Sequence, residues 1–327
     1  MLRRRLKAGL IVALVMMKHI TTLLVVVVLL GYADSAVAQL QGHHAKGGWG
    51  LQSGTQVPEG FFIAPVYTRF DSETLRNADG DKVNQQGSLG VNAFSAFLWW
   101  VSPYKILGAN YGIQASVPLL ESSVEVASLN LETSWGLGDL YVQPINLGWH
   151  LKQADIMASF GVYFPLGRYD ADAIDNTGLG MWTYEFGAGT TVYFDEAKNW
   201  HLAATGYLEF HSGNKDSDAK VGEILTVEGG LGRSFFDGSL LVGVAYYGQW
   251  KLGGDTFGRP LLDDLLMPEK HRVYGIGPDV TLPLVIKKKL IALVTLRYQW
   301  ETGARTNLEG QNFNVLVTFP FFRDPPQ

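Results

Sequence analysis

The chain has 327 residues, a formal net charge of −5, no cysteine, and 17% charged against 12% aromatic residues. The negative charge argues against a nucleic-acid-binding protein, which needs a basic surface, and the lack of cysteine excludes a disulfide-stapled scaffold. The mean hydropathy of +0.06 is too low for a bundle of membrane helices, since each such helix needs about 20 consecutive apolar residues.

Residues 1–38 are predicted to be a secretory signal peptide. The apolar run 20–30 follows basic residues, and small residues lead to an Ala-Val-Ala sequence at 36–38 that is typical of a cleavage site. An upstream basic and apolar stretch makes the signal unusually long, so a start at Met16 or Met17 is the alternative. An uncleaved anchor is disfavoured because the cleavage site is well placed.

Residues 39–59 are rich in glycine and show no periodicity. They are too polar for a core and too short for a domain, so we expect either a flexible periplasmic leader or a plug folded into a pore. The adjacent pair His43-His44 is by itself no metal site. The acidic loop 170–175 departs from the spacing of a calcium loop. The sequence therefore predicts no metal and no other cofactor.

From residue 61 onward, segments of roughly ten residues alternate between apolar and polar or small residues, which is the period of a β-strand. In the segment 182–194, for example, Trp182 and Tyr184 lie on the face opposite Glu185. The expected strands cover 61–70, 91–101, 109–117, 140–151, 156–164, 182–194, 200–211, 225–232, 240–250, 274–282, 290–301 and 313–319.

The connections between these strands alternate between long polar stretches and short turns, as in outer-membrane barrels with long outer loops and short periplasmic turns. The predicted fold is therefore all-β: a transmembrane antiparallel β-barrel of about 12 strands, the even number that closes an outer-membrane barrel. It would span 60–322, followed by a tail at 323–327. A soluble sandwich or propeller is the alternative, but it would not explain the aromatic strand ends, the signal peptide and the loop asymmetry together.

The two faces of the strands give two sets of candidate site residues. Aromatic residues at the ends of the apolar face are expected at the membrane interfaces: Trp100, Trp149, Trp182, Tyr184, Trp200, Trp300 and Phe319. Polar residues on the opposite face are expected to line the lumen: Glu185, Glu209, Glu228, Asp279, Arg297, Glu301, His201, His211, Tyr207 and Gln299. In a pore they would set the local field and bind a passing solute; as ordinary lumen residues they would face water or pair across strands.

No catalytic motif accompanies these residues. The sequence has no G-x-S-x-G, Walker or dinucleotide fingerprint. His211 and Ser212 are the best hint of a barrel esterase, but adjacency in sequence does not establish a nucleophile and base in contact. We therefore expect no enzyme, and the competing function is a structural or adhesive barrel with a closed lumen that acts through its outer loops.

The stretch GLGDLYVQPINLGWH at 136–150 resembles a segment typical of outer-membrane proteins of the "meta-pathway of phenol degradation" family. The sequence TQVPEGFF at 55–62, the turn NADG at 77–80 and the turn PYKILG at 103–108 fit the same family, so the resemblance covers nearly all of the chain after the signal. The chain departs from the usual terminal aromatic residue of such barrels, because Phe322 is followed by Arg-Asp-Pro-Pro-Gln.

The resemblance implies a transporter-like channel in the Gram-negative outer membrane for passive uptake of small hydrophobic or aromatic compounds. Its expected partners are outer-membrane lipid and lipopolysaccharide, the barrel assembly machinery, and the solutes themselves. The oligomeric state is left open.

Overall fold

The computed structural model describes residues 41–83, 87–126, 129–171, 173, 175–216, 219–236, 240–256, 270–287 and 289–321. The predicted signal peptide 1–38 and tail 323–327 lie outside these ranges. None of the described segments forms a helix long and apolar enough to cross a membrane.

The regular structure of the described residues is entirely β, as predicted. The strands are β1 (Gly60–Arg76), β2 (Gly87–Ile106), β3 (Ala109–Val126), β4 (Leu129–Glu132), β5 (Gly136–Leu137), β6 (Leu140–His150), β7 (Ala154–Phe164), β8 (Thr183–Tyr193), β9 (Trp200–His211), β10 (Ile224–Phe235), β11 (Leu240–Lys251), β12 (Arg272–Ile286), β13 (Lys289–Arg305) and β14 (Asn307–Phe321).

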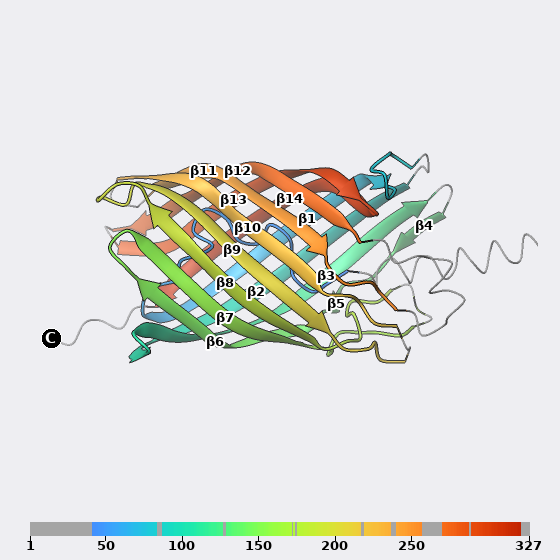
Figure 1. Cartoon of the computed structure of the whole chain (residues 1–327), viewed down its shortest axis with the longest axis horizontal. Coiled ribbons are helices and arrows are strands. Elements are labelled where there is room, and N and C mark those ends of the chain that lie inside the picture. Colours follow the sequence, from blue (N-terminus) through green and yellow to red (C-terminus); the bar gives the residue numbers. More distant parts are fainter. Residues whose placement is uncertain are drawn as a thin grey trace, which may run out of the picture.

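Each long strand pairs antiparallel with its neighbour, β3 pairs with β6, and β1 pairs with both β2 and β14. The sheet is therefore closed, and Figure 1 shows its tilted strands wrapped around one axis. The short strands β4 and β5 are additions to β3, which leaves twelve strands in the wall. Closure pairs every strand and removes the exposed edges that lipid cannot satisfy. The predicted twelve-stranded outer-membrane barrel is confirmed.

Several strands are longer than the sequence alternation predicted. The turn expected at residues 102–105 is part of β2, which continues past a bulge to Ile106; the turn itself lies at Leu107 and Gly108, both with positive φ. Beyond residue 117, β3 continues to Val126. These extensions carry apolar and polar residues in an irregular order, among them Leu119, Leu120 and Lys105. Their sequence therefore lacks the regular alternation that lipid imposes on the middle of a strand.

The outward face of the wall carries the apolar side chains. On β8, Phe186 is 51% exposed, whereas its inward neighbour Glu185 is 2% exposed. All seven aromatic residues predicted at the interfaces lie on this outward face: Trp100, Trp149, Trp182, Tyr184, Trp200, Trp300 and Phe319. Connections at one end of the barrel are long, except for the one-residue turn at Thr306 between β13 and β14, where the sequence predicted a loop; connections at the other end are short. The end with the long connections therefore faces outward from the cell.

Candidate functional site in the barrel lumen

Residues 41–59 lie inside the barrel, where they contact inward-facing side chains from several strands. Figure 1 shows this stretch as a blue coil within the ring of strands. Leu51 is 2% exposed and packs where Gly230 and Gly243 leave room, since a Cβ on either glycine would come within 2.7 Å of its side chain. We call residues 41–59 the lumen segment. It occupies space that a solute passing through the barrel would need.

Three buried glutamates on consecutive strands form a carboxylate cluster beside this segment. Glu185 on β8 is the register partner of Glu209 on β9, and Glu228 extends inward from β10. None of the three is more than 2% exposed. Like charges this close repel, and each is costly to bury alone. The carboxylate cluster therefore needs positive charge and hydrogen-bond donors from elsewhere in the chain.

The lumen segment supplies both through two adjacent histidines. In His44, Nδ1 lies 2.7 Å from Glu185 Oε2, and Nε2 lies 2.7 Å from Glu228 Oε1. A neutral imidazole has only one N–H group, so hydrogen bonds to two ionised carboxylates require the doubly protonated, positively charged ring. The backbone N–H groups of His43 and His44 both donate to Glu209 Oε1, at 2.8 and 3.0 Å.

The His43 side chain connects the segment to a different part of the wall. Its Nε2 lies 2.8 Å from Asp139 Oδ2, and its Nδ1 lies 2.8 Å from the Thr183 hydroxyl. Asp139 also accepts the backbone N–H groups of Gly167 and Leu179, each at 2.8 Å. One carboxylate thus holds both the lumen segment and the loop between β7 and β8.

Tyrosine rings complete the site. The His43 ring stacks on Tyr163 with centroids 4.7 Å apart, and the His44 ring stacks on Tyr207 at 4.3 Å. The Tyr141 hydroxyl donates to Glu185 Oε1 at 2.8 Å. The wall therefore offers flat aromatic faces next to hydrogen-bond acceptors, and two planar rings of the chain itself occupy them.

A second set of contacts holds the segment against β12 and β13. Lys46 Nζ lies 2.7 Å from Glu301 Oε1. Arg297 donates from Nε to Asp279 Oδ2 at 2.7 Å and from Nη1 to the Gly47 carbonyl at 2.9 Å. The segment is thereby fixed by polar contacts to two groups of strands, β8–β10 and β12–β13, rather than by a single anchor.

His271, just before β12 at the outer mouth, adds no charge to these contacts. Burial lowers its pKa to about 3, and the nearby Lys251 and Lys46 act in the same direction. Its ring is therefore neutral at physiological pH, and the positive charges in this set of contacts are those of Lys46 and Arg297.

All ten residues predicted to line the lumen have buried, inward-facing side chains in the structure. Those that the structure brings against the lumen segment, directly or through a partner, are Glu185, Glu209, Glu228, Tyr207, Glu301, Arg297 and Asp279. Of the other three, Gln299 packs against the segment at Gly47, where an added Cβ would overlap Gln299 Oε1. His211 Nε2 lies 3.8 Å from Glu209 Oε1, and its Nδ1 contacts the Gly222 carbonyl. The polar side-chain atoms of His201 have no hydrogen-bond partner among the described residues.

Sequence reasoning missed His43, His44 and Asp139 as site residues. Their partners lie about 100 residues or more away along the chain, so no local pattern marks them. The one available signal is that Asp139 lies in the GLGDLYVQP stretch that carries the family resemblance. Within the described ranges, no group of three or more His, Cys, Asp or Glu side chains is arranged to hold a metal ion.

His211 and Ser212, the best candidates for an esterase site, do not form a nucleophile–base pair. The Ser212 hydroxyl donates to the Gly213 carbonyl at 2.8 Å, whereas His211 Nδ1 contacts the Gly222 carbonyl at 3.1 Å. A nucleophile must lie within hydrogen-bond reach of its base. In the part of the chain that the structure describes, these two side chains have no such contact.

The packing of Leu51 against Gly230 can be tested by adding one methyl group at position 230. In a G230A variant the added Cβ would lie 2.7 Å from Leu51 Cδ2 and 2.9 Å from the Val244 carbonyl. Overpacking of this kind destabilises the packed position of the lumen segment by about 1–3 kcal/mol. A cysteine placed at position 53 should therefore react with maleimide about 5 to 150 times faster in the G230A background than in the native one. G206A is the matched control, because its Cβ meets nothing nearer than 3.9 Å. Equal rates in the two variants would contradict the packing.

The family model described as "Putative MetA-pathway of phenol degradation" matches residues 72–317 of this chain. Among solved structures, the chain is similar to the COG4313 outer membrane channel from Pseudomonas putida F1, with a TM-score of 0.68 and 15% identity over 83% of this chain and 98% of that one. It also resembles two autotransporter structures more distantly. The translocator domain of NalP from Neisseria meningitidis has a TM-score of 0.44 and 14% identity, over 92% of this chain and 98% of that one. The transport unit of AIDA-I from Escherichia coli has a TM-score of 0.45 and 8% identity, over 90% and 98%.

A comparison with curated protein sequences finds no match. The family match nevertheless covers well over half of the chain, and the closed antiparallel barrel agrees with it in fold. The chain therefore belongs to the Putative MetA-pathway of phenol degradation family and is a β-barrel of the Gram-negative outer membrane.

Proposed function

We propose that this barrel is a channel for passive uptake of small hydrophobic or aromatic compounds, and that the lumen segment closes it in the resting state. The observation that carries the proposal is the pair of imidazole rings stacked on Tyr163 and Tyr207 beside the carboxylate cluster. The family description, which names phenol degradation, and the structural neighbour named an outer membrane channel both support it.

The same contacts suggest what a solute would do in the lumen. A phenol ring placed where the His44 ring lies would stack on Tyr207, and its hydroxyl group would donate to Glu185 or Glu228. Stacked aromatic pairs contribute about 0.5–1.5 kcal/mol beyond buried area. An aromatic carboxylate such as benzoate would meet the carboxylate cluster and be repelled. We therefore expect the channel to favour neutral aromatic solutes with a hydroxyl group over anionic ones.

Uptake into liposomes tests this function. A variant lacking residues 39–57 is expected to pass phenol at least about tenfold faster than the full chain, since a barrier lowered by 1.4 kcal/mol already gives that factor. It should pass benzoate more slowly than phenol at equal concentration. Q52A, which changes an exposed residue of the lumen segment, should behave as the full chain does.

A closed structural or adhesive barrel is the competing function. It predicts equally negligible phenol flux with and without residues 39–57, together with no conductance in planar bilayers after the deletion. That result would overturn the channel proposal. Equal flux of phenol and benzoate would retain a channel but contradict the role assigned to the carboxylate cluster.

A further inference from the structure

Two arginines face outward from the wall at the outer rim, well apart from the lumen. Arg272 is the first residue of β12 and Arg305 the last of β13, and the two are register partners. Their chain neighbours Val273 and Ala304 are 0% and 2% exposed and point into the barrel. Successive side chains of a strand point to opposite faces, so both guanidinium groups lie on the outside of the wall.

The aromatic residues below them place this pair at the level of the lipid head groups. Tyr274 follows Arg272 on the same face, and the Arg272 guanidinium lies 5.8 Å from its ring centroid. Trp250 on β11 donates its indole N–H to the Tyr274 hydroxyl at 3.3 Å, and Trp300 on β13 is 52% exposed on the same outer face. Such aromatic belts mark the membrane interface, so the arginines lie at its outer side.

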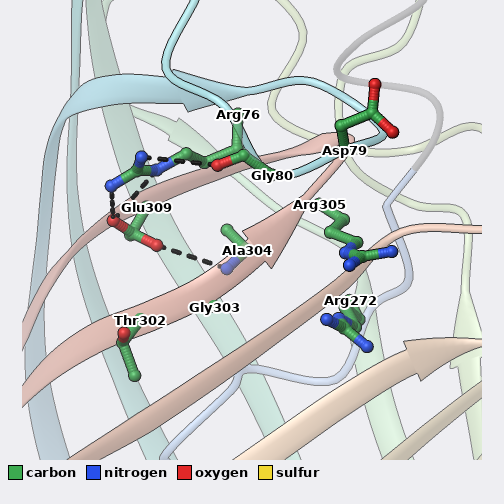
Figure 2. A pocket seen from close by; sticks show the side chains of 9 residues that line it. All are labelled: Arg76, Asp79, Gly80, Arg272, Thr302, Gly303, Ala304, Arg305 and Glu309. Carbon is green, nitrogen blue, oxygen red and sulfur yellow. Dashed lines mark hydrogen bonds and ion pairs between the residues drawn. The ribbon is translucent and has the colours of Figure 1, made fainter.

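Neither arginine forms an ion pair with a carboxylate among the described residues. Like charges directly opposite on paired strands destabilise a sheet, and Arg272 Nε is buried with no hydrogen-bond acceptor. Arg76 nearby is different, because it forms an ion pair with Glu309 at 2.5 Å. Figure 2 shows this pair joined by dashed lines, whereas Asp79 points away from the other two guanidinium groups.

A cavity of about 310 Å³ lies beside the pair, and both arginines line it. Its other lining residues are Arg76, Asp79, Gly80, Thr302, Gly303, Ala304 and Glu309. With Arg76 and Glu309 neutralising each other, the lining keeps an excess of positive charge. Guanidinium groups bind phosphate through two parallel N–H donors, and this geometry is the reason arginine is favoured at phosphate sites.

We propose that Arg272 and Arg305 bind a phosphate group of an outer-leaflet glycolipid, the lipid A part of lipopolysaccharide. The charge, the cavity and the height in the membrane each match such a group, whereas a soluble anion would have no reason to prefer the lipid-facing side of the wall. The bound phosphate neutralises the facing arginines and holds the rim of β12 and β13. This site is independent of the lumen and of the proposed transport.

The test measures lipid A that stays with the purified full-length barrel, by mass spectrometry under non-denaturing conditions. Each arginine near a charged membrane surface contributes about 1 kcal/mol, which is about a fivefold change in binding. R272Q and R305Q should therefore each retain about fivefold less diphosphorylated lipid A, and the double variant about thirtyfold less. The native barrel should retain dephosphorylated lipid A only as weakly as the double variant does.

R233Q is the matched control. Arg233 is also an arginine over a tryptophan, 5.1 Å from the Trp200 ring, but it lies at the end of β10 on the opposite rim. The R272K/R305K variant keeps the charge but loses the planar fork, and should fall between the native barrel and the double glutamine variant. Heat-dependent gel migration verifies that each barrel is folded.

Three results would overturn the proposal. These are native retention of lipid A in R272Q/R305Q, an equal loss in R233Q, or release of lipid A by millimolar inorganic phosphate. The last would show that the site takes a soluble anion instead. None of these results depends on whether the barrel transports phenol.

Discussion

The H44A variant should expose the lumen segment about 150 to 4,000 times more often than the native chain does. In the native protein the His44 ring lies 2.7 Å from both Glu185 and Glu228, and all three side chains are buried. Removing one partner of a buried ion pair costs about 3–5 kcal/mol because the remaining charge is left unpaired, and each 1.4 kcal/mol is a factor of ten in an equilibrium.

A single thiol reports this exposure without interference, since the chain has no cysteine. Ser53 is 7% exposed, and its hydroxyl donates to the Glu228 carbonyl at 3.2 Å. The reaction of S53C with a membrane-impermeant maleimide in proteoliposomes should therefore be slow in the native background and fast with H44A. Q52A/S53C controls for a change in the neighbouring exposed residue. Native labelling rates in H44A/S53C would show that His44 does not hold the segment.

The barrel wall could be predicted from sequence because its cause is local. Lipid on one side and the lumen on the other impose period two on every strand, so Trp182 and Glu185 could be assigned to opposite faces from their spacing alone. The predicted strand 182–194 agrees with β8, Thr183–Tyr193. The prediction was wrong at strand ends such as 102–106, where Ser102, Pro103 and Lys105 have the composition of a turn, but β2 continues past a bulge and still pairs with β3.

The lumen contacts could not be predicted because their cause is not local. His43 donates to Glu209 across 166 positions of sequence, and nothing in residues 39–59 indicates which wall residues they meet. The negative charge of the inward wall residues was the one feature of the sequence that could have pointed to these contacts. Glu185, Glu209 and Glu228 extend inward from three consecutive strands and cannot all be buried and ionised without compensation. The lumen segment, with two histidines and a lysine, is a nearby source of that positive charge.

The R297L variant should destabilise the barrel by about 3–5 kcal/mol, because it leaves the buried Asp279 carboxylate without its partner. Asp279 is 1% exposed, and Arg297 Nε donates to it at 2.7 Å. Denaturant unfolding of the barrel in lipid vesicles, followed by tryptophan fluorescence, measures the loss. A variant as stable as the native barrel would contradict the importance of this ion pair.

The double variant D279L/R297L separates the two roles of Arg297. An apolar pair commonly replaces a buried ion pair at little cost, so the stability of the wall should largely return. The Gly47 and Gly48 carbonyls, however, lose the Nη1 donor that lies 2.9 and 2.7 Å away, and hydrogen bonds to a charged group contribute about 1.5–3 kcal/mol each. Labelling of S53C should therefore stay at least about tenfold faster than in the native chain even in a barrel of native stability. Restored stability with native labelling would show instead that Arg297 only neutralises Asp279, and that the other contacts of the lumen segment hold it without Arg297.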